Sequence, residues 1–291
     1  MFKIFAKYFC NHQLDRNQII NASKNDALII NNLSYRYHKK LPEVLKNLSF
    51  SIKKNSFTTI LGPNGCGKST TAKAIVKLLK LKKNIIKVFD RNINELSFKQ
   101  LAQLISYIPQ SIEIPQGTRV IDFITFGRNP YLGFSGILGK EDKLIIDLVI
   151  NEMQLHDLKE KFMQELSGGQ RQKVILALCL VQDTPIILLD EPTTYLDIKN
   201  QYELLESLKK LQILRQKTII AILHDINQAI QYSDEVFVLK NGQIYANGNP
   251  NEVITKELLK NVYNIDAQID IVDNQKIVHK IKVKDYLSNS E

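Results

Sequence analysis

The segment Gly62-Pro-Asn-Gly-Cys-Gly-Lys-Ser69 constrains the fold of this chain more than any other feature. It follows Phe57–Leu61, a largely β-branched run of strand length. The residues after it are apolar at the spacing of one helix face, i, i+3, i+4 and i+7: Ala72, Ile75, Val76 and Leu79. A loop of the pattern G-x-x-x-x-G-K-[ST] between a strand and a helix is typical of polyphosphate-binding proteins. We therefore expect an α/β fold with this loop at the end of a strand.

The residue types in this loop suit the phosphates of a nucleotide. Glycines let the backbone approach the phosphates and point its N–H groups at their oxygens. Lys68 is expected to meet the β- and γ-phosphates, and the Ser69 hydroxyl is expected to bind Mg²⁺. The predicted nucleotide-binding residues of the loop are Gly62, Pro63, Asn64, Gly65, Cys66, Gly67, Lys68, Ser69 and Thr70. The N–H dipoles around Cys66 favour a thiolate, so we expect alkylation of this thiol to block nucleotide binding.

Two acidic residues follow a second apolar run, Ile186–Leu189. In open α/β sheets, ligands bind at the carboxyl ends of the strands, where Asp190 and Glu191 would lie. Adjacent carboxylates can take different roles there. Asp190 is expected to hold the magnesium ion, and Glu191 to polarise the water that attacks the γ-phosphate.

The rest of the pattern predicts three kinds of structure. Leu28–Leu33 and Val44–Ile52 alternate apolar and polar residues, which predicts antiparallel strands. The apolar runs Ile186–Leu189 and Thr218–Leu223, separated by a helical segment at Gln201–Leu214, predict a parallel βαβ unit. From about Leu96 to Asp183 the pattern is mostly helical. Near the C-terminus, a hairpin is expected at Glu235–Lys240, Asn241-Gly242 and Gln243–Asn247, then a short helix at Glu252–Val262 and weaker strand-like residues.

Charge leaves several partner classes open. Lys and Arg number 39 against 30 Asp and Glu, which gives a net charge of +9. Such a charge fits a nucleic acid, an anionic membrane surface or an anionic ligand. Because lysine far exceeds arginine and Ile and Asn are abundant, coding bias in an AT-rich genome explains the charge equally well.

Cysteine spacing and hydropathy bear on the compartment. The cysteines are Cys10, Cys66 and Cys179, an odd and widely spaced set that indicates neither a disulfide framework nor a zinc site. No apolar stretch approaches the ~20 residues needed to span a bilayer, and the N-terminus lacks the apolar region of a secretory signal. We expect the chain to remain in the cytosol.

The segment Leu166-Ser-Gly-Gly-Gln170 precedes a predicted helix and lies 23 residues, counted from Ser167, before Asp190. Ser167 and the two glycines would therefore form a second helix N-terminus that can bind an anion. In this position the sequence resembles the ATP-binding-cassette (ABC) ATPases, whose signature reads LSGGQ. The resemblance runs from about Ala27 to Val262, and the motifs agree in order and spacing.

The resemblance implies further site residues. Tyr37 is similar to the aromatic that stacks on adenine, Gln110 to the Q-loop glutamine that senses Mg²⁺ and the attacking water, and His224 to the switch histidine at the γ-phosphate. Asp197 resembles the D-loop aspartate. The implied catalytic residues are Glu191, His224 and Lys68, and the implied Mg²⁺ ligands are Ser69, Gln110 and Asp190. The partner subunit of a two-copy dimer would supply Ser167, Gly168, Gly169, Gln170 and Asp197.

The resemblance also implies an architecture. A P-loop nucleoside-triphosphatase cassette has a RecA-like mixed-sheet core, an N-terminal antiparallel β subdomain and a helical subdomain that carries the signature. We accordingly expect a basic extension at residues 1–26, an ATPase domain at residues 27–263 with a helical subdomain at about 97–183, and a tail at residues 264–291.

The implied function is ATP hydrolysis by one subunit of a membrane importer, with ATP as substrate and Mg²⁺ as cofactor. Separate transmembrane permease subunits and an extracytoplasmic substrate-binding protein are the expected partners, no nucleic acid is expected, and the subunit would lie peripherally on the cytoplasmic face of the membrane. Gly127-Arg-Asn-Pro-Tyr131 is similar to a segment of iron–siderophore, haem and cobalamin importers, so we expect ferric siderophore import. Haem, cobalamin, and zinc or manganese import are alternatives, as is a chromosome-maintenance or repair ATPase from a different class.

Overall fold

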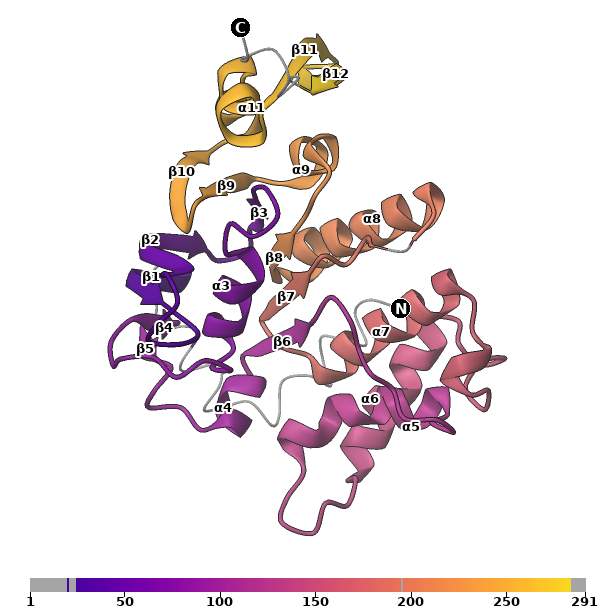
Figure 1. Cartoon of the computed structure of the whole chain (residues 1–291). Coiled ribbons are helices and arrows are strands. Elements are labelled where there is room, and N and C mark those ends of the chain that lie inside the picture. Colours follow the sequence, from indigo (N-terminus) through magenta and orange to yellow (C-terminus); the bar gives the residue numbers. More distant parts are fainter. Residues whose placement is uncertain (1–19, 21–24, 195, 284–291) are drawn as a thin grey trace, which may run out of the picture.

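The centre of the molecule is a six-stranded mixed sheet with the strand order β10-β9-β3-β8-β7-β6 (Figure 1). The structure is a computed structural model that describes residues 20, 25–194 and 196–283. Five strands run parallel, and β10 is antiparallel to β9 at one edge. The strands are β3 (Phe57–Leu61), β6 (Ile105–Ile108), β7 (Ile186–Asp190), β8 (Thr218–Ile222), β9 (Glu235–Lys240) and β10 (Gln243–Gly248).

Both faces of the central strands are buried, which explains why these strands are apolar throughout. Side chains alternate between two hydrophobic clusters, as the period of a strand requires. In β7, Ile187 and Leu189 belong to one cluster, and Ile186 and Leu188 belong to the other. The sheet therefore separates two cores and holds the carboxyl ends of its strands on one edge.

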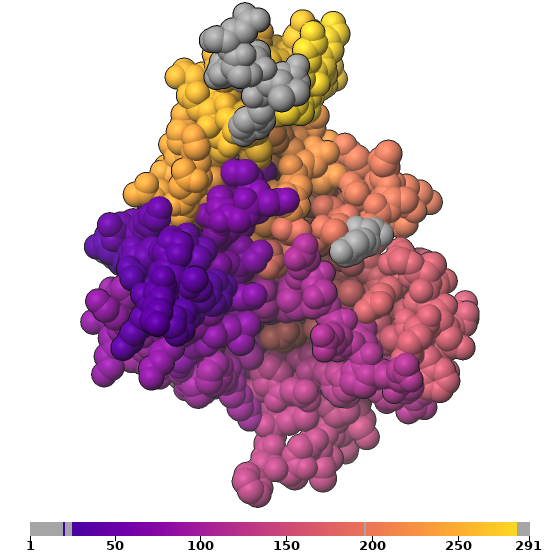
Figure 2. Space-filling view, in the orientation of Figure 1, coloured from indigo at the N-terminus to yellow at the C-terminus, as the bar shows by residue number. Residues whose placement is uncertain are grey.

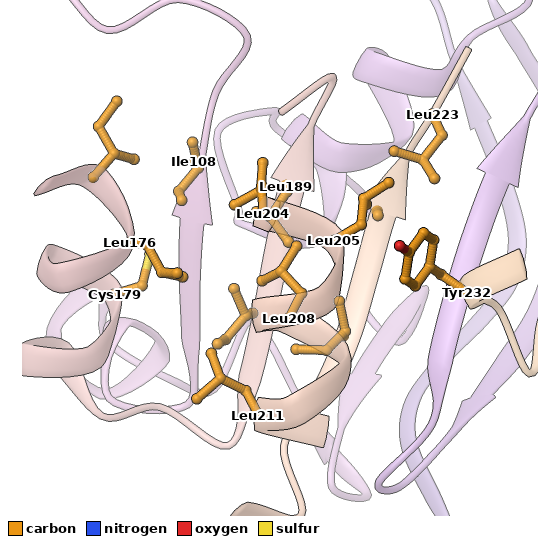
Figure 3. Packing of buried hydrophobic residues seen from close by; sticks show 14 of the residues in the cluster. Ile108, Leu176, Cys179, Leu189, Leu204, Leu205, Leu208, Leu211, Leu223 and Tyr232 are labelled. Carbon is orange, nitrogen blue, oxygen red and sulfur yellow. The ribbon is translucent and has the colours of Figure 1, made fainter. Parts of the chain in front are cut away.

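Helices cover the face of the sheet to which Ile187 and Leu189 point. Leu205 and Leu208 of α8 are fully buried and lie among residues of β7 and α7 (Figure 3). The helices of this layer and its surroundings are α5 (Val120–Thr125), the 3₁₀ helix η1 (Phe126–Tyr131), α6 (Lys140–Glu152), the 3₁₀ helix η2 (Met163–Glu165), α7 (Gly168–Gln182), α8 (Ile198–Arg215) and α9 (Ile226–Tyr232).

The second face packs against α3 (Lys68–Ile75) and an antiparallel sheet of order β2-β1-β4-β5. The four strands are β1 (Asp26–Tyr35), β2 (Leu45–Lys53), β4 (Ile86–Val88) and β5 (Arg91–Asn92), and the short helix α4 (Phe98–Ala102) follows them. Together the layers make an α/β architecture with a mixed sheet, an antiparallel sheet and helices, as the sequence predicts.

Most of the predicted elements are confirmed. β1 and β2 pair antiparallel, and β7, α8 and β8 form the parallel βαβ unit. β9 and β10 form the predicted hairpin. Its turn residues Asn241 and Gly242 have φ of 51° and 81°, the left-handed values that a type I′ turn requires.

The helix after the phosphate-binding loop is shorter than predicted, since α3 ends at Ile75 and Leu79 lies beyond it. Lys77 takes a left-handed φ of 61°. The N–H groups of Lys77 and Leu78 donate to the carbonyls of Ala74 and Lys73, which is the hydrogen-bond pattern of a Schellman cap. This cap ends the helix. Its left-handed position is usually taken by glycine, and because a lysine stands there, the sequence gives no sign that the helix ends.

Two other segments differ from the sequence analysis. Within the mostly helical region, Ile105–Ile108 forms the edge strand β6, which was missed. The helix expected at Glu252–Val262 is two helices, α10 (Pro250–Val253) and α11 (Lys256–Tyr263). The helix is interrupted between them because a new helix, α11, begins after Thr255, whose hydroxyl caps it by accepting from Leu258 N at 3.1 Å.

Residues 265–283 form a further pair of strands. β11 (Ile265–Val272) and β12 (Gln275–Val283) pair as a hairpin that lies at one end of the molecule (Figures 1 and 2). Val278 is buried, and its N–H and C=O both pair with the side-chain amide of Asn227 on α9, at 2.8 and 3.0 Å. Most of the predicted 1–26 extension, and Cys10 with it, lies outside the described residues, and β1 already begins at Asp26. None of the helices in the described part is long and apolar enough to cross a bilayer.

Candidate functional site

The glycine-rich loop joins β3 to α3 and is shaped by two glycines. Gly62 has φ of 147°, and a Cβ there would lie 2.4 Å from Leu239 O. Gly67 has φ of 109°, and a Cβ there would lie 2.6 Å from Leu45 Cδ2. Larger residues therefore do not fit at either position. Gly67 is also the N-cap residue of α3, and it has no side chain that could accept from the first N–H groups of this helix.

Lys68 lies inside the loop with only 5% of its surface exposed. Its Nζ donates to Gly62 O at 2.8 Å and to Pro63 O at 3.1 Å. Asn64 and Gly65, at the tip of the loop, are exposed. The buried ammonium and the uncapped helix thus place positive charge and free N–H donors on one concave stretch of backbone, which is the electrostatic requirement for binding a polyphosphate.

Ser69 and Asp190 meet across the end of the sheet. Ser69 Oγ donates to Asp190 Oδ1 at 3.0 Å, and Tyr107 OH approaches Asp190 Oδ2 at 3.5 Å. Burial and the adjacent Glu191 charge raise the pKa of Asp190, and the hydrogen bond from Ser69 opposes that shift. A carboxylate and a hydroxyl at this separation provide the hard oxygen ligands that Mg²⁺ prefers. Two of the three predicted Mg²⁺ ligands, Ser69 and Asp190, therefore suit the ion, whereas the amide of the third, Gln110, donates to Glu191.

Glu191 is the centre of a second cluster beside the loop. Its Oε1 lies 2.6 Å from His224 Nε2, and its Oε2 accepts from Gln110 Nε2 at 2.6 Å. Glu191 takes a left-handed φ of 54°, which for a residue with a side chain is typical of functional sites. β6, β7 and β8 end side by side, so residues at their carboxyl ends meet although the three strands are far apart in sequence. This cluster can orient a water molecule and accept its proton.

The expectation of a Cys66 thiolate is wrong. Cys66 is 3% exposed, and burial raises the pKa of its thiol, although the nearby Lys68 charge acts in the opposite direction. The side chain points into the core that contains Ala72 and Leu239 rather than toward the solvent side of the loop. Desolvation of the sulfur has the largest effect on this pKa, and it outweighs the opposing hydrogen bonds from the backbone N–H groups of Lys68 and Cys66.

Three tyrosines lie next to the loop, and only Tyr37 was predicted. Tyr37 is half exposed, its OH lies 3.2 Å from Thr70 Oγ1, and its ring meets the Tyr35 ring edge to face. Tyr107 lies on β6, a strand that the sequence pattern did not predict. The Tyr263 hydroxyl is buried near Gly62 and Cys66, and burial raises its pKa. Nothing in the local sequence of α11 indicates that its last residue packs beside the loop.

The signature residues form the start of α7. Ser167 Oγ accepts from Gln170 N at 3.3 Å, and Gln170 Oε1 accepts from Ser167 N at 3.1 Å, so the two side chains form a capping box. Ser167 and Gly168 are exposed, and a Cβ on Gly169 would lie 2.6 Å from Asn200 Oδ1. Asp197, also exposed, caps α8 by accepting from Asn200 N at 2.8 Å. Among the described residues, no hydrogen bond connects the signature turn to Gly62–Thr70.

A cleft of about 380 Å³ separates the signature helix from the Glu191 cluster. Gln110 and Glu191 line one side, and Gly168 and Arg171 line the other. Arg171 crosses toward the opposite side, donating to Ile112 O at 3.2 Å. The two groups of predicted site residues thus lie on opposite sides of one open cleft.

The Gly127–Tyr131 segment serves packing within the chain. Arg128 is buried and donates to Asp142 Oδ1 at 2.8 Å and to Val181 O at 2.9 Å. Tyr131 OH donates to Gln182 O at 2.8 Å. A Cβ on Gly127 would lie 2.6 Å from Leu178 O. The segment therefore fixes η1 against α6 and α7.

Comparisons with known proteins show the family of this chain. The profile of a family described as ABC transporter matches residues 45–194, slightly more than half of the chain. The iron(3+)-hydroxamate import ATP-binding protein FhuC of Bacillus subtilis is 38% identical over 226 residues, covering 78% of this chain and 84% of that protein.

Solved structures give the same result. A structure titled as an inward-facing conformation of a putative metal-chelate type ABC transporter matches with a TM-score of 0.75 and 25% identity, covering 88% of this chain and 96% of that chain. The ATP-binding cassette MJ0796, a dimer bound to ADP and Pi, matches with a TM-score of 0.66 and 26% identity over 77% and 98% of the two chains. The fold is therefore that of an ATP-binding cassette, and the chain belongs to the ABC transporter family.

Proposed function

We propose that this chain hydrolyses ATP as the energy-supplying subunit of an importer, and that the transported substrate is a ferric siderophore. The observation that carries the ATPase assignment is the contact of Glu191 with both Gln110 and His224, at 2.6 Å each, beside the uncapped start of α3. One residue in this cluster has the charge to activate water, and two others hold it in place.

In the proposed mechanism, the loop Gly62–Thr70 binds the triphosphate through its N–H groups, and Lys68 exchanges its loop carbonyls for the β- and γ-phosphate oxygens. Tyr37, exposed beside Thr70, stacks on the adenine. Ser69 and Asp190, with Gln110, would hold Mg²⁺, which when bound neutralises charge on the β- and γ-phosphate oxygens. Glu191 polarises the attacking water, and His224 contacts the γ-phosphate.

The signature turn acts on the nucleotide of a second copy. Ser167 and Gly168 are exposed and lie on a different side of the cleft from Glu191. A head-to-tail dimer would bring Ser167–Gln170 and Asp197 of one subunit to the loop of the other. The similar cassette MJ0796 forms a dimer, which supports this arrangement.

The siderophore assignment rests on the relatives. FhuC imports iron(3+)-hydroxamate by its name, and the similar solved transporter is described as metal-chelate type. In the proposed assembly the chain lies peripherally on the cytoplasmic face of the membrane, bound to separate permease subunits that receive cargo from an extracytoplasmic binding protein. Haem, cobalamin, and zinc or manganese are the competing cargoes.

Uptake assays test the cargo. Deleting the gene should abolish uptake of radioactive iron from a ferric hydroxamate, and the wild-type gene should restore it. Loss of haem, cobalamin, zinc or manganese uptake with normal ferric hydroxamate uptake would replace the siderophore by that cargo. DNA should leave the ATPase rate of the purified chain unchanged, and stimulation by DNA would support a repair ATPase instead.

The Glu191→Gln variant tests the chemistry. It should bind ATP, trap the closed dimer and hydrolyse ATP at least about 100-fold more slowly, because an amide cannot accept the proton of water. Glu203→Gln, an exposed change on α8, serves as the control and should keep wild-type turnover. Near-normal turnover in Glu191→Gln would contradict the role of Glu191.

A further inference from the structure

His224 is followed directly by a helix that fixes its position. Asp225 caps α9, and its Oδ1 accepts from Gln228 N at 3.0 Å. Gln228, three positions after the cap, carries a buried side chain. A movement of the His224 backbone relative to Glu191 would therefore be coupled to α9 through this cap.

Gln228 has an unusual environment for an amide. It is 1% exposed, its Nε2 donates to Gln201 Oε1 at 2.7 Å, and its own Oε1 is buried with no hydrogen-bond partner among the residues that the structure describes. An apolar side chain of the same length would fill the space and leave no unpaired acceptor. Packing alone does not explain a glutamine at this position.

Gln201 carries the connection to a second part of the site. Its Nε2 donates to Leu196 O at 3.0 Å, in the turn that ends at Asp197. The start of the same turn is hydrogen-bonded to Glu191, because Thr194 N donates to Glu191 O at 3.3 Å. Glu191 in turn contacts His224 through its carboxylate.

These contacts form a closed ring: Glu191, the turn with Leu196, Gln201, Gln228, α9 and His224 return to Glu191. We propose that Gln201 and Gln228 are positioning residues that hold His224 at Glu191 and link it to the turn that carries Asp197. The proposal rests on the proposed ATPase function and adds a physical route between the switch histidine and the residue implied to contact the partner subunit. Neither glutamine contacts the phosphate-binding loop through a hydrogen bond in the described part of the chain.

Steady-state ATPase kinetics of Gln201→Met and Gln228→Met test the proposal. Methionine matches glutamine in length but cannot form the two hydrogen bonds. Each variant should lower kcat about fivefold and leave KM for ATP within about twofold, because the ring orients the reacting groups without binding the nucleotide. The double variant should also lose about fivefold rather than about 25-fold, since either change opens the same ring.

Gln212→Met is the matched control. Gln212 also lies on α8, donates through Nε2 to a backbone carbonyl, Asn55 O at 2.7 Å, and has a buried Oε1 without a described partner. It lies outside the ring, so kcat should remain at the wild-type value even if the melting temperature falls. Gln201→Glu keeps an acceptor for Gln228 but loses the donor to Leu196 O, and it should behave like Gln201→Met.

The outcomes separate the two levels of the proposal. If wild-type protein hydrolyses ATP and the Gln201 and Gln228 variants keep its kcat, or lose no more than Gln212→Met, the positioning role is contradicted and the ATPase function stands. Wild-type protein without ATPase activity contradicts both. Should Gln228→Met not fold, Gln201→Met, at a partly exposed position, decides the question alone.

Discussion

The two helices that begin at glycine-containing motifs, α3 and α7, start in opposite ways. α3 begins at Lys68 after a left-handed glycine with no side-chain cap, and Lys68 is buried. α7 begins after Ser167, whose hydroxyl caps the helix together with Gln170, and Ser167 is exposed. α3 leaves its first N–H groups open to a ligand that the same chain binds. The other satisfies part of its own N-terminus and faces outward.

This difference separates two kinds of site. The α3 site is assembled from one chain, because β3, β7 and β8 bring the loop, Asp190 and Glu191 together at one edge of the sheet. The α7 turn is closed by its capping box, and in the proposed dimer it acts on the loop of the second subunit. Changes at α3 should therefore weaken ATP binding, whereas changes at α7 should affect catalysis in the dimer and leave ATP binding by a single chain unchanged.

The largest effect is expected from Lys68→Ala. Removing the buried ammonium should weaken ATP binding about 100-fold, since charged hydrogen bonds to the phosphates are lost. Fluorescent-nucleotide titration measures the affinity. Lys80→Ala, on the exposed segment after α3, should bind ATP like the wild type. If the ATP affinity of Lys68→Ala stayed within about threefold of wild type, the claim that the α3 site binds ATP would be contradicted.

An intermediate effect is expected from Ser167→Ala. Loss of the cap should cost about 1 kcal/mol of unfolding free energy and lower ATPase turnover about tenfold, with unchanged ATP affinity. Ser97→Ala is a matched control, because Ser97 caps α4 through a capping box with Gln100. It should lose similar stability, measured by urea denaturation, and keep its turnover. Equal turnover losses in the two variants would assign the effect of Ser167 to stability alone.

The smallest effect is expected at Cys66. Because burial raises the pKa of this thiol, little thiolate exists at pH 7, and N-ethylmaleimide should label Cys66 at least about tenfold more slowly in the native protein than in urea. The labelling rate should rise with pH as the thiolate fraction grows. Cys66→Ala should keep ATP affinity within about twofold. Rapid native labelling at pH 7, located at Cys66 by mass spectrometry, would restore the thiolate interpretation.

The α/β class and the contents of the loop were predictable because their signals are local. Phe57–Leu61, the loop glycines and the acids after Ile186–Leu189 each combine a backbone period with a chemical requirement. The pairing of β7 with β8 followed from the helix between them, and the β9–β10 hairpin followed from Asn241-Gly242. In each case neighbouring residues determine the structure.

Features set by distant contacts were not predictable. β6 is a four-residue edge strand whose pairing with β7 fixes it. α3 ends at Ile75 and is followed by a left-handed Lys77, a residue type with no preference for a left-handed φ. The state of the Cys66 thiol depends on burial by the surrounding core, which outweighs the loop dipoles seen in the sequence. The hydrogen bond between Gln201 and Gln228 joins residues 27 positions apart, and no local pattern marks either one.

A mixing experiment tests the central claim that α3 and α7 complete each other across two subunits. Lys68→Ala has a defective loop and Ser167→Arg a defective signature, so each variant alone should hydrolyse ATP very slowly. A mixed dimer contains one site in which an intact loop of one subunit faces an intact signature of the other. We predict that mixing the two purified variants restores ATPase activity well above the sum of the separate rates. A mixture whose rate equals that sum, although mixed dimers are detected, would contradict the account.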